Sequence, residues 1–101
     1  MRIYAMAWEE KERGWGHRPD GWSLHLTSDD YDRHLERHSA STPWPLPEEY
    51  SFPVQGLALR PVEIADDHPL AKRLMRERSL RIEHHERLDI EQLLGVSWPG
   101  L

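Results

Sequence analysis

Apolar and polar residues alternate in two runs near the start of the chain, as they do in half-buried strands. The first run extends from Met1 to Trp8 and the second from Trp22 to Thr27. In the first, Ile3, Ala5 and Ala7 would face one side, and Tyr4, Met6 and Trp8 the other. In the second, Trp22, Leu24 and Leu26 would face away from Ser23, His25 and Thr27. Because a glycine-rich loop joins the runs, they most simply form an antiparallel hairpin.

Capping residues and apolar residues spaced three or four apart predict the helices. Thr27 to His38 is the clearest, since Thr27 and Asp30 form a capping-box pattern. A second helix is predicted to start at Asp66-Asp67-His68-Pro69, with proline in its first turn. Its buried stripe consists of Leu70, Leu74 and Met75. A last short helix, carrying Ile90, Leu93 and Leu94, is predicted from Asp89 to Gly95.

The segment between the first two helices contains four prolines and four large apolar residues. The apolar residues are Trp44, Leu46, Tyr50 and Phe52. Flexible tethers rarely contain so many, so residues 39–56 are predicted to be extended and packed over the core. Leu57 to Ile64 is predicted as a third strand, at an edge or bulge because Pro61 cannot donate to a neighbour. Ser79 to Glu83 is predicted as a short fourth strand.

These elements predict an α+β fold with the order β-β-α-β-α-β-α. The fold would contain a small antiparallel sheet of about four strands and two to three helices. A chain of 101 residues is the usual size of a single domain. We expect residues 1–82 to form its core, and residues 83–101 to be a C-terminal extension with a short helix.

Composition narrows the functional classes. The chain has no cysteine, which excludes disulfides and thiolate chemistry and favours a reducing, cytoplasmic location. Its net charge of −5 argues against a dedicated nucleic-acid-binding protein. No window is long enough to span a membrane, so a membrane partner is not expected. The N-terminal run does not resemble a signal peptide.

The loop from Arg13 to Trp22 is the strongest candidate binding site. Glycine allows close approach of a partner, and tryptophan and arginine are the residues that most often dominate interfaces. Together with His25 on the following strand, the candidate binding residues are Trp15, His17, Arg18, Asp20, Trp22 and His25. The alternative is structural: Trp15 and Trp22 would belong to the core, and Arg18 would pair with Asp20 across a turn.

Other patterns are better explained structurally. His34 and His38 have the four-residue spacing of helical zinc ligands, but no third ligand is fixed, although His25 or His84-His85 could approach in space. The basic run from Lys72 to Arg81 is typical of a solvated helix face. No nucleophile motif or phosphate-binding glycine motif is present, so catalytic residues, a metal and a cofactor are not expected. Enzyme activity is therefore disfavoured but not excluded, because His25 lies on a strand beside the loop.

The segment Arg13-Gly14-Trp15-Gly16-His17-Arg18-Pro19-Asp20-Gly21-Trp22-Ser23-Leu24-His25 resembles a group of small uncharacterised prokaryotic proteins of the phage and plasmid type. The resemblance continues weakly through Asp29–Asp32 and Pro47–Pro53, and covers about residues 1–82. It implies a fold boundary and draws attention to the loop. By association with mobile elements, it also implies an inhibitor of a host defence complex.

Two functional hypotheses remain. The first is a non-catalytic protein-binding module that docks on another protein, which could be a multi-subunit host complex, with Trp15, Arg18 and Trp22 as anchors. The alternative is a domain that recognises a small ligand or nucleotide, with or without hydrolysis, through His17, Arg18, Asp20 and His25. The sequence is compatible with a monomer or a homodimer.

Overall fold

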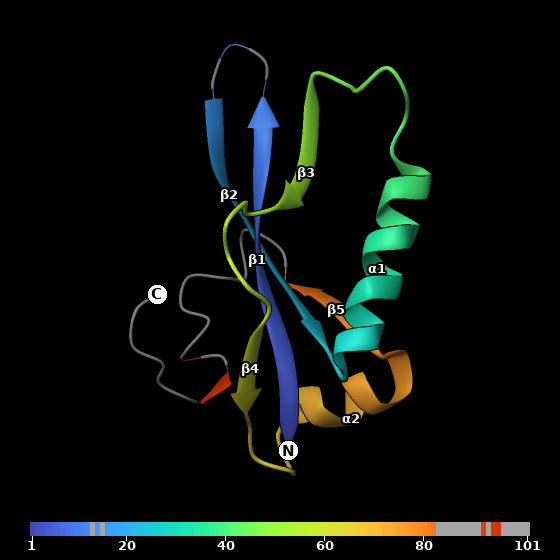
Figure 1. The fold of residues 1–101 in the computed structure, drawn as a ribbon. Helices are drawn as coiled ribbons and strands as arrows, with labels where there is room; N and C mark the ends of the chain where they lie inside the picture. Colours follow the sequence, from blue (N-terminus) through green and yellow to red (C-terminus); the bar gives the residue numbers. More distant parts are fainter. Residues whose placement is uncertain (13, 15, 83–91, 93, 96–101) are drawn as a thin grey trace.

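The computed structural model describes residues 1–12, 14, 16–82, 92, 94 and 95. Five strands and two helices follow one another in these residues (Figure 1). They are β1 (Arg2–Glu12), β2 (Gly16–His25), α1 (Ser28–Ser41), β3 (Glu49–Pro53), β4 (Arg60–Glu63), α2 (Pro69–Glu77) and β5 (Ser79–Ile82). The strands form one antiparallel sheet. The predicted α+β class is therefore confirmed.

The long strand β1 organises the sheet. Along one side it pairs with β2, and β2 pairs in turn with β5. Along the other side, its N-terminal half pairs with β4 and its C-terminal half with β3. The observed order is β-β-α-β-β-α-β, because the proline-rich connection contains the additional strand β3. The last predicted helix falls outside the described residues, apart from positions 92, 94 and 95.

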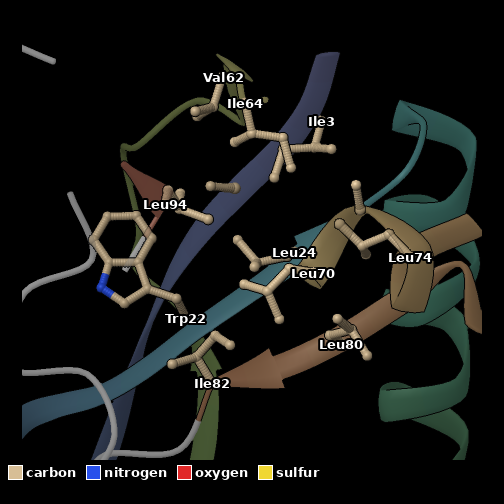
Figure 2. Close-up of a cluster of buried hydrophobic side chains, with 12 residues drawn as sticks. Ile3, Trp22, Leu24, Val62, Ile64, Leu70, Leu74, Leu80, Ile82 and Leu94 are labelled. Atoms are coloured by element: carbon tan, nitrogen blue, oxygen red, sulfur yellow. The ribbon is translucent and has the colours of Figure 1, made fainter. Parts of the chain in front are cut away.

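One face of the sheet and the helix α2 enclose the hydrophobic core. Alternate residues of β2 and β5 point into it, and α2 contributes Leu70, Ala71 and Leu74. Figure 2 shows Trp22 and Leu94 at one end of the cluster, with Leu74 and Leu80 at the other. Leu94, which lies beyond residue 82, is only 1% exposed and belongs to the same core.

The helix α1 covers the opposite face. Ser23, His25, Ser79 and Arg81 alternate with the core residues of β2 and β5, so their side chains point away from α2 and toward α1. This second layer is polar, and it contains the buried residues Ser23, His25 and Asp30.

The two helices begin at different kinds of cap. The predicted capping box is confirmed, since Thr27 Oγ1 accepts from the Asp30 backbone and Asp30 Oδ2 accepts from the Thr27 backbone, both at 3.1 Å. The N-cap of α2 is His68, within the predicted start Asp66-Asp67-His68-Pro69, and its Nδ1 accepts a hydrogen bond from the Leu70 backbone at 3.0 Å. Pro69 takes the first helical position, as predicted.

The prediction that the connection between α1 and β3 packs over the core is wrong. Trp44 is 87% exposed and Leu46 is 44% exposed. In Figure 1 this connection crosses the top of the view, from the end of α1 to the start of β3. The strand β4 is confirmed as an edge strand, since it pairs with β1 alone and contains Pro61.

Candidate functional site

A β-bulge divides the hairpin that carries the candidate residues. Ala7 pairs with Trp22 and Glu9 pairs with Pro19, so Asp20 and Gly21 together oppose the single residue Trp8. Gly21 has a φ of 79°, which a residue with a Cβ adopts only with strain. The extra residue lets Asp20 reach the α1 side of the sheet, where it meets Ser51 and Arg81.

The bulge makes a direct prediction about stability. Replacing Gly21 by alanine is expected to lower the free energy of unfolding by about 1–2 kcal/mol, because alanine resists the positive φ. Urea denaturation of the variant measures this loss. As a control, Glu36→Ala on the exposed side of α1 should stay within about 0.5 kcal/mol of the wild type. Equal stability of Gly21→Ala and the wild type would show that the bulge does not need glycine.

His17 and Arg18 lie beyond the bulge, at the open end of the hairpin. The His17 ring is 5.4 Å from the Phe52 ring, and its Nδ1 lies 3.5 Å from Glu9 Oε2. Arg18 Nη2 lies 3.1 Å from Glu10 Oε1 and 3.3 Å from Glu12 Oε2. The predicted Arg18–Asp20 pair is therefore replaced by a pair with two glutamates of β1. Trp15, the third predicted residue of this loop, lies outside the described residues.

The other three predicted residues lie inside the molecule. Asp20 Oδ2 accepts from Ser51 Oγ at 2.6 Å, and Arg81 Nη2 lies 3.3 Å from the same oxygen. Trp22 is 9% exposed in the hydrophobic core, so its proposed role as a docking anchor is corrected to a packing role. His25 is fully buried beneath α1. The structure thus does not bring His17, Arg18, Asp20 and His25 together in one site.

A buried chain of hydrogen bonds fixes the protonation of His25. Trp8 Nε1 can only donate, so Ser23 Oγ accepts from it at 2.7 Å. The Ser23 proton then goes to His25 Nε2 at 2.7 Å, which leaves the ring proton on Nδ1. Nδ1 donates to Ser79 Oγ at 2.8 Å, and Ser79 Oγ donates to the Asp30 carbonyl at 3.4 Å. Every donor in this chain has an acceptor only while His25 is neutral.

Burial lowers the pKa of His25 to about 3, and the positive charges of His34 and Arg81 act in the same direction. The ring of His34 lies 5.2 Å from that of His25, so these two histidines do approach each other. His34 and His38 both turn their edges toward the Trp8 ring, at 5.8 and 4.9 Å. Within the described part of the chain, no group of three candidate ligands is placed to hold a metal ion.

Sequence analysis missed the surface formed at the open end of the hairpin. We call it the distal sheet: residues 8–12 of β1, residues 16–19 of β2, and β3, at the top of Figure 1. The strand register places His17, Tyr50 and Phe52 on one face of it. The Phe52 ring lies 5.4 Å from His17 and 5.6 Å from Tyr50, so the three form a continuous aromatic row.

Two exposed side chains extend this row. Leu46 lines a shallow depression with His17 and Tyr50, and lines a second one with Trp44, Tyr50 and Phe52. The signal in the sequence was the set of four large apolar residues within a proline-rich segment. The segment is predicted to pack over the core, but two of these residues, Trp44 and Leu46, are exposed.

The distal sheet is acidic. It contains four glutamates, Glu9, Glu10, Glu12 and Glu49, against Lys11 and Arg18. The nearby charge of Glu12 raises the pKa of Glu49, and Glu10 adds to the effect. The raised pKa shows that these carboxylates repel one another.

Comparison with protein-family models, with curated proteins and with solved structures finds no match. Among the described residues, no helix has the length and apolar character needed to cross a membrane.

Proposed function

We propose that the protein is a binding module that docks on another protein through the distal sheet. The single observation that carries this proposal is Trp44, which is 87% exposed at the end of an aromatic row. Burying a large aromatic side chain in a partner's pocket is among the strongest contributions to an interface. The anchor is Trp44 in place of the buried Trp22. Arg18 lies on the opposite face of the distal sheet, where it pairs with Glu10 and Glu12.

The negative charge of this surface indicates which kind of partner it would bind. Glu9 shares the face of the aromatic row, and Glu12 lines the depression beside His17 and Tyr50. The register turns Glu10 and Glu49 to the opposite face. The matching partner is a protein with an apolar pocket bordered by lysine or arginine. A multi-subunit host defence complex, as the sequence resemblance suggests, is the proposed setting for such a partner.

The alternative function, recognition of a small ligand or nucleotide by the hairpin loop, has less support. Of its four residues, His17 and Arg18 face glutamates of β1. Asp20 is bound by Ser51 and Arg81, and His25 is fully buried. Docking through the aromatic row uses groups that are accessible in the folded chain.

Affinity capture from host-cell lysate, read by mass spectrometry, tests the proposal. The wild type is compared with Trp44→Ala, with the double variant Glu9→Gln/Glu12→Gln, and with Met75→Ala. Met75 is the matched control, because it is 66% exposed but lies on α2. We expect one stoichiometric partner that is retained by Met75→Ala and lost by Trp44→Ala.

The purified partner then tests the charge argument. The double variant should bind it more weakly than the wild type, and added salt should reduce that difference. The proposal is overturned if Trp44→Ala and Met75→Ala capture the same proteins in the same amounts. A partner that binds equally well with and without the glutamates would overturn its electrostatic part.

A further inference from the structure

A cavity of about 450 Å³ lies between α1 and the sheet, next to the depression that Trp44 lines. Residues from four elements line it. They are Trp8 of β1, Ser51 of β3, Arg81 of β5, and His34, Arg37, His38 and Ser41 of α1. Its size is within the range of cavities that bind small molecules, about 300–1,000 Å³. It is also large enough for more than a single ion.

The lining of the cavity is cationic in a chain of negative net charge. None of the described residues that line it is acidic, and two of them are arginines. Arg33, one turn earlier on α1, is held by Asp30 at 3.1 Å. No carboxylate among the described residues pairs with Arg37, which is exposed at the cavity. Asp20 contacts two of the lining residues, Arg81 and Ser51.

The second arginine is fixed in place. The guanidinium carbon of Arg81 lies 4.4 Å from the centre of the Trp8 ring, over its face. Its Nη2 donates to the Asp20 carbonyl at 2.9 Å. Stacking and hydrogen bonding together hold the plane of the guanidinium, so little side-chain entropy remains to be lost when a ligand binds.

The lowered pKa of His34 is consistent with a positive electrostatic potential in the cavity. Burial lowers the pKa of His34, and the charges of Arg81, Arg37 and His38 lower it further. An anion in the cavity would reverse the effect of these charges. The imidazoles of His34 and His38 would then act as additional donors to it.

We infer that this cavity binds the phosphate group of a small phosphomonoester. The donors converge from two elements: α1 provides Arg37, His34 and the ring nitrogen of His38 that does not contact the Ser51 carbonyl, and β5 provides Arg81. Ser51 adds no donor, because its hydroxyl already donates to Asp20. Donors arriving from several directions suit the tetrahedral oxygens of phosphate, whereas a planar carboxylate is satisfied by one guanidinium. The remaining volume takes the organic part of the ligand. The cavity adjoins the docking surface, since His38 and Ser51 also line the depression beside Trp44.

Calorimetric titration with AMP, inorganic phosphate, adenosine and glutarate tests the inference. We expect AMP and inorganic phosphate to bind, and adenosine and glutarate to give no signal. Arg37→Gln should weaken AMP binding by about tenfold or more, the usual effect of losing a hydrogen bond to a charged group. Arg76→Gln, the same change of charge on the exposed surface of α2, should leave the affinity unchanged.

Imidazole resonances in NMR spectra locate the ligand. AMP should shift those of His34 and His38, and leave those of His17 and His68 in place. Circular dichroism confirms that Arg37→Gln is folded, as expected for an exposed residue. The inference is overturned if millimolar AMP and phosphate do not bind, or if glutarate or adenosine binds as well as AMP. It is also overturned if Arg37→Gln and Arg76→Gln weaken binding equally.

Discussion

Acidification from pH 6.5 to pH 3 is expected to lower the free energy of unfolding by several kcal/mol through His25. Burial holds the pKa of this histidine at about 3, whereas an unfolded chain takes up a proton near pH 6.5. Between these values the unfolded state binds one proton more than the folded state, so stability falls with pH. At about 1.4 kcal/mol per unit, the full window corresponds to about 4–5 kcal/mol. That loss is a large part of the stability of a small domain.

Two other ionisable groups, Asp30 and His34, also lower the free energy of unfolding as the pH falls, but Asp30 does so over a different pH range. Burial of Asp30 opposes ionisation, yet hydrogen bonds from Thr27, Arg78 and Arg33 outweigh it and lower its pKa to about 2. Its contribution is therefore lost only between about pH 4 and pH 2. The lowered pKa of His34 adds to the loss that begins near pH 6.5. Between pH 6.5 and pH 4 the histidines lower the stability as the pH falls, whereas the raised pKa of Glu49 acts in the opposite direction.

Urea denaturation at intervals between pH 7 and pH 4 measures this slope. His25→Gln removes the titrating ring, so its stability should depend less on pH, whatever its absolute value. His17→Gln is the control, because half of its side chain is exposed, and it should keep the slope of the wild type. A wild-type stability that is constant from pH 6.5 to pH 4 would contradict a neutral, buried His25.

Local rules predicted the features that depend on neighbouring residues. The capping box at Thr27 and Asp30, the edge position of Pro61 and proline at the start of α2 all follow from short-range geometry. The alternation around Leu24 also identified which side chains share a face. It could not show which helix covers which face, because that depends on contacts between residues far apart in the chain.

The errors also have physical causes. Pro19-Asp20-Gly21 looks like a loop in the sequence, but Gly21 forms a bulge inside a continuous strand. The bulge changes the register, so Arg18 meets the glutamates of β1 and Asp20 meets Arg81. The strand β3 was missed because prolines flank it, although at the sheet edge it needs neighbours on one side only. The residues of the candidate site could therefore be predicted from the sequence, but the contacts between them could not.

Replacing Trp8 by alanine is expected to lower the free energy of unfolding by about 3–5 kcal/mol. The indole is 2% exposed and is surrounded by His34, His38 and Arg81. These polar neighbours cannot close an empty space as apolar side chains would, because the Arg81 guanidinium is already fixed by Asp20. The variant also leaves Ser23 without the donor that begins the buried hydrogen-bond chain.

Trp8→Phe separates packing from hydrogen bonding. It keeps most of the ring but removes the indole N–H, so it should cost about 1–3 kcal/mol, less than alanine. Urea denaturation at neutral pH measures both variants, and Trp44→Phe on the exposed connection should change stability by less than about 0.5 kcal/mol. If Trp8→Ala cost no more than Trp44→Phe, the polar layer under α1 would not depend on Trp8. If the predicted losses of stability are observed, Trp8 holds both Arg81 and the hydrogen-bond chain that leads to His25. The shape of the cavity and the protonation of His25 then both depend on Trp8.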